Sequence, residues 1–182
     1  HYEKGFHSTG TVGSIGAAVA AARLLGLDVD ATARAIALAA TQAAGLKAMF
    51  GTMAKPLHAG KAAAHGVIAA KLAAAGFTAA PDALEAEQGF LAVLAPGADR
   101  EASQRVATVP EFGSYVRGNL YKYHASCYLT HSALSALAGL RRDHGLEPPD
   151  IASVHITVPK GHLSVCNIAE PRSGLESKFS LR

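Results

Sequence analysis

The chain has 182 residues, of which 49% are hydrophobic and 17% charged, and it carries a net formal charge of +3. This is the composition of a globular protein with one large core or two small ones, which excludes a disordered chain. Aromatic residues make up 6% of the chain, tryptophan is absent and the basic residues form no dense stripe, which disfavours a nucleic-acid-binding protein. The longest apolar stretch reaches Arg23 too early to span a bilayer, so we expect no membrane partner.

Cysteine usage and the chain ends add two expectations. Cys127 and Cys166 are too few for a disulfide framework or a zinc cluster, which favours a reducing compartment and predicts a cytoplasmic location. The sequence starts at HYEKGFH, without an initiator methionine, and ends at SKFSLR. We therefore expect a piece of a longer polypeptide.

Small and aliphatic residues dominate the first part of the chain, and their spacing predicts a tight helical bundle. Glycines at the expected helix ends, and Asp30 as an expected N-cap, set the helix bounds. Residues 55–60 are expected to form a loop that leads into a helix. The predicted helices cover residues 13–25, 31–44, 61–75, a short stretch at 82–86, and 131–142.

The second part of the chain has a mixed character. Residues 89–118 hold two prolines and are predicted to be connecting structure. In IASVHITVP the β-type residues alternate, which predicts a strand that Pro159 ends. The change of character places a domain boundary near Tyr115. The predicted fold is therefore mainly α, with an all-helical part followed by part of an α+β unit.

The stretch FGTMAKPLHAGKAAAHG gathers four basic side chains, and the nearest carboxylates in sequence are Asp30 and Asp82. One interpretation is a solvated basic face. The other is an anion site in which a partly buried Lys55, placed among apolar residues, has a lowered pKa and acts as a base. A shared metal ion is excluded, because His58 and His65 would lie two helical turns apart.

Two further segments combine basic and hydroxyl side chains without acids. In GFHSTGTVGSIG, His7 precedes an expected helix start, where free N–H groups favour an anion; an ordinary capped helix with a core histidine is the alternative. In YVRGNLYKYHASCYLTHS, lysine, histidine and tyrosine alternate and could hold a carboxylate. Together the three segments suit proton transfer on a small polycarboxylate without a cofactor, because no dinucleotide, flavin, pyridoxal or zinc pattern accompanies them.

The order of several motifs resembles the MmgE/PrpD family, and the resemblance covers essentially the whole chain. The motifs are GFHSTGTVGSIGAAVAAARLLGL, QAAGL, KPLHAGKAAAHGVIAAKLAAAGFT, KYHASCYLTHSA and SKFSL. The resemblance implies a cofactor-free enzyme that acts on di- or tricarboxylates and is a homodimer at full length. It also implies that residues 1–114 are part of the all-helical domain and residues 115–182 the first part of the smaller α+β lid, with the active site between the two.

Carried over by motif, the resemblance implies specific roles. The implied catalytic residues are Lys55, His7, Tyr2 and Lys122, with Lys55 as the main base or acid. The implied substrate-binding residues are His58, Tyr123, Cys127 and His131. The decarboxylases of the family have a histidine five positions after the lid lysine, whereas this chain has Cys127, which disfavours decarboxylation.

The leading hypothesis is therefore a hydro-lyase similar to 2-methylcitrate dehydratase. An epimerase of an iminodisuccinate-like substrate is the alternative within the family. A non-catalytic helical module that docks an acidic partner is the alternative from another class. Because the resemblance places further active-site residues outside this chain, we expect the isolated chain to be inactive.

Overall fold

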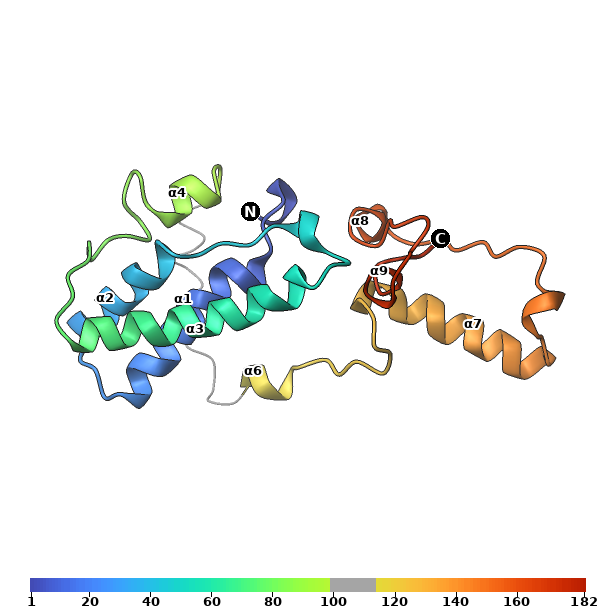
Figure 1. Cartoon of the computed structure of the whole chain (residues 1–182), viewed down its shortest axis with the longest axis horizontal. Coiled ribbons are helices and arrows are strands. Elements are labelled where there is room, and N and C mark those ends of the chain that lie inside the picture. The colour runs from blue at the N-terminus through green and yellow to red at the C-terminus, as the bar shows by residue number, and fades with distance from the viewer. Residues whose placement is uncertain (99–113) are drawn as a thin grey trace. The chain divides into compact units, whose positions relative to one another are not determined.

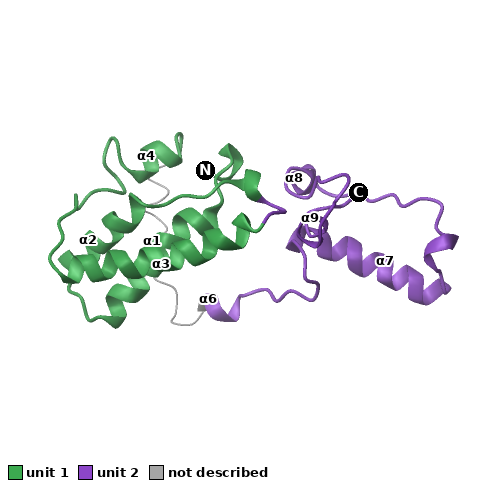
Figure 2. Cartoon of the chain, viewed as in Figure 1, with its two compact units in different colours: residues 1–49, 53–109 green, residues 50–52, 110–182 purple. Residues whose placement is uncertain are grey.

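A computed structural model describes residues 1–98 and 114–182 of the chain. The chain divides into two compact units (Figure 2): unit 1 comprises residues 1–49 and 53–109, and unit 2 comprises residues 50–52 and 110–182. The mainly α prediction is confirmed. None of the helices in the described part of the chain is both long and apolar enough to cross a membrane.

Unit 1 is built on three helices that pack against one another (Figure 1). They are α1 (Ser8–Leu24), α2 (Val29–Ala40) and α3 (Ala54–Ala74). Their shared core consists of small side chains, which lets the helix axes approach closely. Its buried members are Ala18, Ala22, Ala35, Leu38, Ala39, Ala69, Ala70 and Ala73.

The helices α1 and α3 approach each other closely at a glycine. A Cβ added at Gly66 would lie 2.6 Å from the backbone nitrogen of Ala18 and 2.7 Å from the carbonyl carbon of Ala17. No side chain fits in that space without moving one helix. The glycine and alanine bias of the sequence is therefore a packing requirement of this helix pair.

The three helices differ from the sequence prediction at their starts. α1 begins at Ser8 rather than near residue 13, and the N-cap of α2 is Asp28, whose Oδ1 accepts from the Ala31 N–H at 2.7 Å, rather than Asp30. The predicted loop at residues 55–60 is wrong, because these residues form the first two turns of α3. Pro56 lies in the first turn, where its missing N–H is not needed, so it does not break the helix.

The helix ends follow the glycines more closely. Gly26 and Gly76 have φ of 68° and 84°, just after the last turns of α1 and α3. The Phe77 N–H reaches back to the Leu72 carbonyl at 2.9 Å, which closes the end of α3. By contrast, α2 ends at Ala40, before the predicted stop at Gly45, and residues 82–86 form turns rather than a helix. The segment predicted as connecting structure includes the short helices α4 (Phe90–Leu94) and α6 (Ser114–Arg117), and its residues 99–113 lie outside the described part of the chain.

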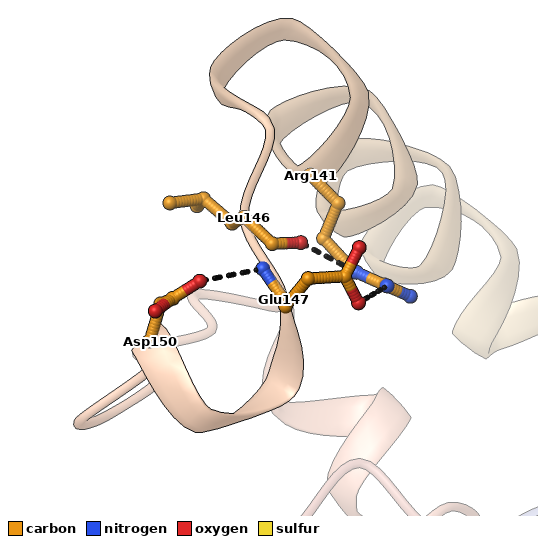
Figure 3. Close-up of polar contacts among 4 residues, drawn as sticks. All are labelled: Arg141, Leu146, Glu147 and Asp150. Atoms are coloured by element: carbon orange, nitrogen blue, oxygen red, sulfur yellow. Dashed lines mark hydrogen bonds and ion pairs between the residues drawn. The ribbon is translucent and has the colours of Figure 1, made fainter.

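Unit 2 contains one long helix, α7 (His131–His144), as predicted for residues 131–142. Gly145, with φ of 61°, ends it, and Arg141 reinforces this end (Figure 3). The Arg141 guanidinium donates from Nε to the Leu146 carbonyl and from Nη2 to the Glu147 carboxylate, both at 3.1 Å, and the Glu147 N–H donates to Asp150. These bonds are solvent-exposed, so they shape the turn more than they stabilise the unit.

The other described elements of unit 2 are short. They are the helix α6 given above, the helices α8 (Lys160–Leu163) and α9 (Gly174–Ser177), and the single turns η3 (Tyr128–Thr130) and η4 (Pro148–Asp150). Unit 1 has two comparable turns, η1 (Tyr2–Lys4) and η2 (Lys47–Met49). The strand predicted for residues 151–158 is not formed, since within the described residues this segment has no ladder partner.

The core of unit 2 is small, and Phe50, which lies far from the other members in sequence, packs against it. Val165, Cys166 and Phe179 are buried, and the Phe50 ring stacks on Phe179 with centroids 5.2 Å apart. The predicted domain boundary near Tyr115 stays a prediction.

Candidate active site

His7 is fixed at the start of α1 by a short pairing of two segments. Its N–H donates to the Gly45 carbonyl at 3.0 Å, and the Lys47 N–H donates to the Gly5 carbonyl at 2.8 Å. Its own carbonyl accepts from Gly10 and Thr11, the first bonds of the helix. The residue is only 6% exposed. His7 is therefore both the N-cap of α1 and a buried histidine, and its anion-binding role stays a prediction.

His58 contacts His7 directly. The two Nδ1 atoms lie 2.9 Å apart, with the ring centroids at 5.2 Å and the ring planes at 51°. His58 comes from the second turn of α3 and is partly exposed. It was predicted to hold a substrate carboxylate, which stays a prediction, and the structure pairs its Nδ1 with the Nδ1 of His7.

Lys55 lies in the first turn of the same helix and is half-buried. Burial, followed by the charge of Lys55 and then by His58, lowers the pKa of His7 below its ordinary value of 6.5. His7 is therefore neutral at pH 7 and can accept a proton. The first turn of α3 contains no acidic residue, so the helix start and Lys55 both favour an anion nearby.

Tyr2, the fourth predicted residue in unit 1, lies in η1 and is 42% exposed. The Lys47 ammonium lies 4.0 Å from the centroid of its ring. This contact is a cation–π interaction, which orients the ring of Tyr2.

The four remaining predicted residues belong to unit 2. Lys122 and Tyr123 are exposed, and the Lys122 ammonium donates to the Ser126 carbonyl at 2.9 Å. His131 is 8% exposed and its ring packs against His124 and Tyr128, at 5.1 Å in both cases. The structure thus groups the predicted residues into two sets, one in each unit.

A cavity of about 370 Å³ adjoins this second set. Tyr123, His124, His131 and His162 are among its lining residues. In the described part of the chain, the buried Nε2 of His131 and Nδ1 of His162 have no hydrogen-bond partner. His162 was missed from the sequence, because nothing in the KGHL stretch signals that it reaches this cavity. No group of three His, Cys, Asp or Glu side chains among the described residues could hold a metal ion.

Cys127 lies at the edge of the small core of unit 2. Its N–H donates to the Lys178 carbonyl at 2.9 Å, and its side chain packs against the buried cluster. Burial, followed by a hydrogen bond with the Cys127 thiol, raises the pKa of Cys166 to about 12. Both cysteines are reduced.

Comparison with known proteins identifies the family. The family model of the MmgE/PrpD N-terminal domain matches residues 1–103, and that of the MmgE/PrpD C-terminal domain matches residues 124–182. The chain belongs to the MmgE/PrpD family.

Several relatives of this chain are named cis-aconitate decarboxylase. Cis-aconitate decarboxylase from Homo sapiens is 30% identical over 98% of this chain, and that from Aspergillus terreus is 34% identical over 76% of it. The enzyme of the same name from Mus musculus is 39% identical over 50% of the chain. The chain spans 37% of the human relative and 29% of the A. terreus relative.

Within this MmgE/PrpD chain, the structure unites three of the predicted residues at one place, namely His7, Lys55 and His58. Their roles stay predictions. What sequence reasoning missed here is the contact between the two histidines, which lie 51 residues apart.

Proposed function

We propose that the chain is part of a MmgE/PrpD-family lyase that acts on a small di- or tricarboxylate and moves a proton at a carbon next to a carboxylate. The observation that carries this proposal is the buried His7, which is paired with His58 and lies under the charge of Lys55. The names of the relatives support a small tricarboxylate substrate.

The chemistry requires a neutral base beside a cationic environment. Removing a proton from a carbon next to a carboxylate creates a second negative charge, which fixed positive groups stabilise. His7 is neutral at pH 7 because its pKa is lowered, so it can take up a proton. The Lys55 ammonium and the start of α3 attract the carboxylate.

In this proposal Lys55, as an ammonium, is the main acid, and His7 and Tyr2 are its partner proton carriers. Lys122, His131, Tyr123 and Cys127 hold carboxylates, and no cofactor takes part. The full-length protein is a cytoplasmic homodimer.

The hydro-lyase reaction is the leading outcome, and decarboxylation is the second candidate because the relatives are named cis-aconitate decarboxylases. Epimerisation is the third. Both lyase reactions pass through a carbanion next to a carboxylate, so the same proton carriers serve either. Incubating the full-length protein with 2-methylcitrate and with cis-aconitate, and following the products by NMR, separates loss of water from loss of carbon dioxide.

Replacing Lys55 tests the site. In the full-length protein, Lys55→Met is expected to lower turnover by about 10²–10⁴-fold, the usual contribution of a general acid or base. Lys61→Met, an exposed position on the same helix, is the matched control and should keep wild-type turnover. Undiminished activity in a folded Lys55→Met protein would show that this site does not carry the reaction.

A further inference from the structure

The contact between His7 and His58 limits how many protons the two rings can hold. Their Nδ1 atoms are 2.9 Å apart, which is a hydrogen-bond distance. Such a bond needs one proton, carried by one ring and accepted by the other. The two imidazoles therefore cannot both be positively charged while the contact exists.

The surrounding backbone holds His58 in this position. A Cβ added at Gly45 would lie 3.3 Å from His58 Nδ1, and one added at Gly10 would lie 3.3 Å from His58 Cβ. Gly45 also accepts the His7 N–H bond. The two glycines thus leave a space that the His58 ring fills, and the same backbone segment fixes His7 beside it.

We propose that His58 is a positioning residue that shares one Nδ1 proton with His7, so that the two imidazoles take up and release protons as a single unit. The contribution of His58 to catalysis rests on the function proposed above for His7. The site offers His7 Nε2 and His58 Nε2 as the two outer nitrogens of this unit.

Every proton that the histidine pair takes up is released again in this scheme. The neutral pair holds two protons, one between the Nδ1 atoms and one on an outer Nε2. When His7 Nε2 accepts a proton from a substrate carbon, the shared proton moves to His58 Nδ1 and the proton on His58 Nε2 leaves to water. The pair returns to neutrality with its hydrogen bond reversed, and the reverse sequence delivers a proton.

The charges around the pair favour its neutral form. On α3, Lys55 opposes protonation of His7. On the segment packed beside His7, residues 41–46 have no titratable side chain, and the Lys47 ammonium lies over the Tyr2 ring. At the start of α1, His1 Nε2 bonds Thr11 Oγ1 at 2.8 Å.

Long-range ¹H–¹⁵N NMR of the histidine-labelled protein across the acid-to-neutral range tests the shared proton directly. In the wild type, His7 and His58 should titrate together, with one Nδ1 protonated and the other bare in the neutral pair. His58→Ala should raise the pKa of His7. His58→Asn should keep a hydrogen-bond partner, and hence the His7 tautomer, but should abolish the coupled titration.

His65→Asn, two turns further along α3, is the matched control and should leave the His7 titration unchanged. A His7 titration that is the same in wild type, His58→Asn and His58→Ala would overturn the proposal, as would two protonated or two bare Nδ1 atoms in the neutral wild type. If His58→Ala does not fold, His58→Asn alone tests the proposal, because the coupled titration must be absent from the spectra of that variant.

Turnover of the full-length protein gives an independent second measurement. We expect both His58 variants to lose at least about 10-fold in kcat and to shift the acid limb of the pH–rate profile, while His65→Asn does not. Altered histidine spectra with unaltered kinetics would show that the histidine pair does not contribute to catalysis. The spectra can be interpreted even if the proposed reaction is wrong, so failure of the shared proton and failure of the function are distinguishable.

Discussion

At the scale of single residues, burial shifts two titratable groups in opposite directions. His7 has a lowered pKa, because its charged form is an imidazolium that burial and Lys55 oppose. Cys166 has a raised pKa, because its charged form is a thiolate that burial opposes. Each shift has a measurable consequence that depends on its sign.

Acid should destabilise the protein partly through His7. A histidine whose pKa is lower in the folded state contributes stability above its unfolded value, and this contribution is lost as the pH falls through the folded pKa. Urea unfolding of wild type at pH about 7.5 and about 5 should therefore show a larger loss than the same comparison for His7→Gln. His65→Gln should behave as the wild type; an equal loss in wild type and His7→Gln would contradict the lowered pKa.

Cys166 should resist alkylation in the folded protein. With a pKa of about 12, only about one thiol in 10⁴ is ionised at pH about 8, against roughly a quarter for an ordinary cysteine. Mass spectrometry after iodoacetamide treatment should thus show modification about 10³-fold slower in native than in urea-unfolded protein. Equal rates in the two states would show that Cys166 is not held as a buried thiol.

At the scale of the elements, two helices of unit 1 depend on local features that the sequence alone left ambiguous. α3 continues through Pro56 and Gly60 and meets α1 at Gly66. α2 is capped by Asp28, although Asp30 has the same side chain two residues later. Matched substitutions show which of Gly60 and Gly66, and which of Asp28 and Asp30, contributes more to the stability of its helix.

The contact between α1 and α3 is tested by two glycines on one helix. Gly66→Ala should destabilise the protein by about 1–3 kcal/mol, because its Cβ would overlap the backbone of α1. Gly60→Ala should stabilise it by up to about 1 kcal/mol, because no atom lies within 4 Å of an added Cβ and alanine favours a helix. Denaturant unfolding measures both; a neutral Gly66→Ala would contradict the close packing.

The cap of α2 is tested by the two aspartates. Asp28→Ala should cost about 1 kcal/mol of unfolding free energy, because the Ala31 N–H loses its acceptor. Asp30→Ala should cost only about 0.3 kcal/mol, from the lost charge near the helix start. The reverse order of the two effects would show that the sequence prediction of the cap was right.

At the scale of the whole molecule, the two units differ in how self-sufficient their cores are. The buried residues described in the alanine-rich core of unit 1 come from α1, α2 and α3. The described core of unit 2 has three buried residues and packs against Phe50, which lies in residues 50–52, a segment separate in sequence from residues 110–182. Unit 2 thus depends on a residue that its own contiguous sequence does not supply.

Separate expression of the two parts tests this difference. Residues 1–98 should unfold cooperatively by circular dichroism, because the buried side chains of the described core of unit 1 all lie in that segment. Residues 114–182 should show no cooperative transition, because the stacking of Phe50 on Phe179 is lost and few apolar contacts remain. A cooperative transition in residues 114–182 would show that Phe50 is dispensable.

The sequence by itself determined the features that depend on neighbouring residues. The helical class, the stops at Gly26 and Gly76, and the span of α7 follow from local periodicity and from glycines with positive φ. The two segments that supply His7, Lys55 and His58 were also recognisable, because their lack of acids is visible in the order of residues.

Only the tertiary structure decided which of these residues meet. The pairing of His7 with His58 joins positions 51 residues apart, and His58 lies against Gly10 of α1 and Gly45 of the segment between α2 and α3. The strand predicted at residues 151–158 was wrong for the same reason, since alternation shows that a segment can pair but not whether a partner is present. Local patterns set the elements, and contacts between distant segments set the site, because the latter depend on packing that no single stretch of sequence contains.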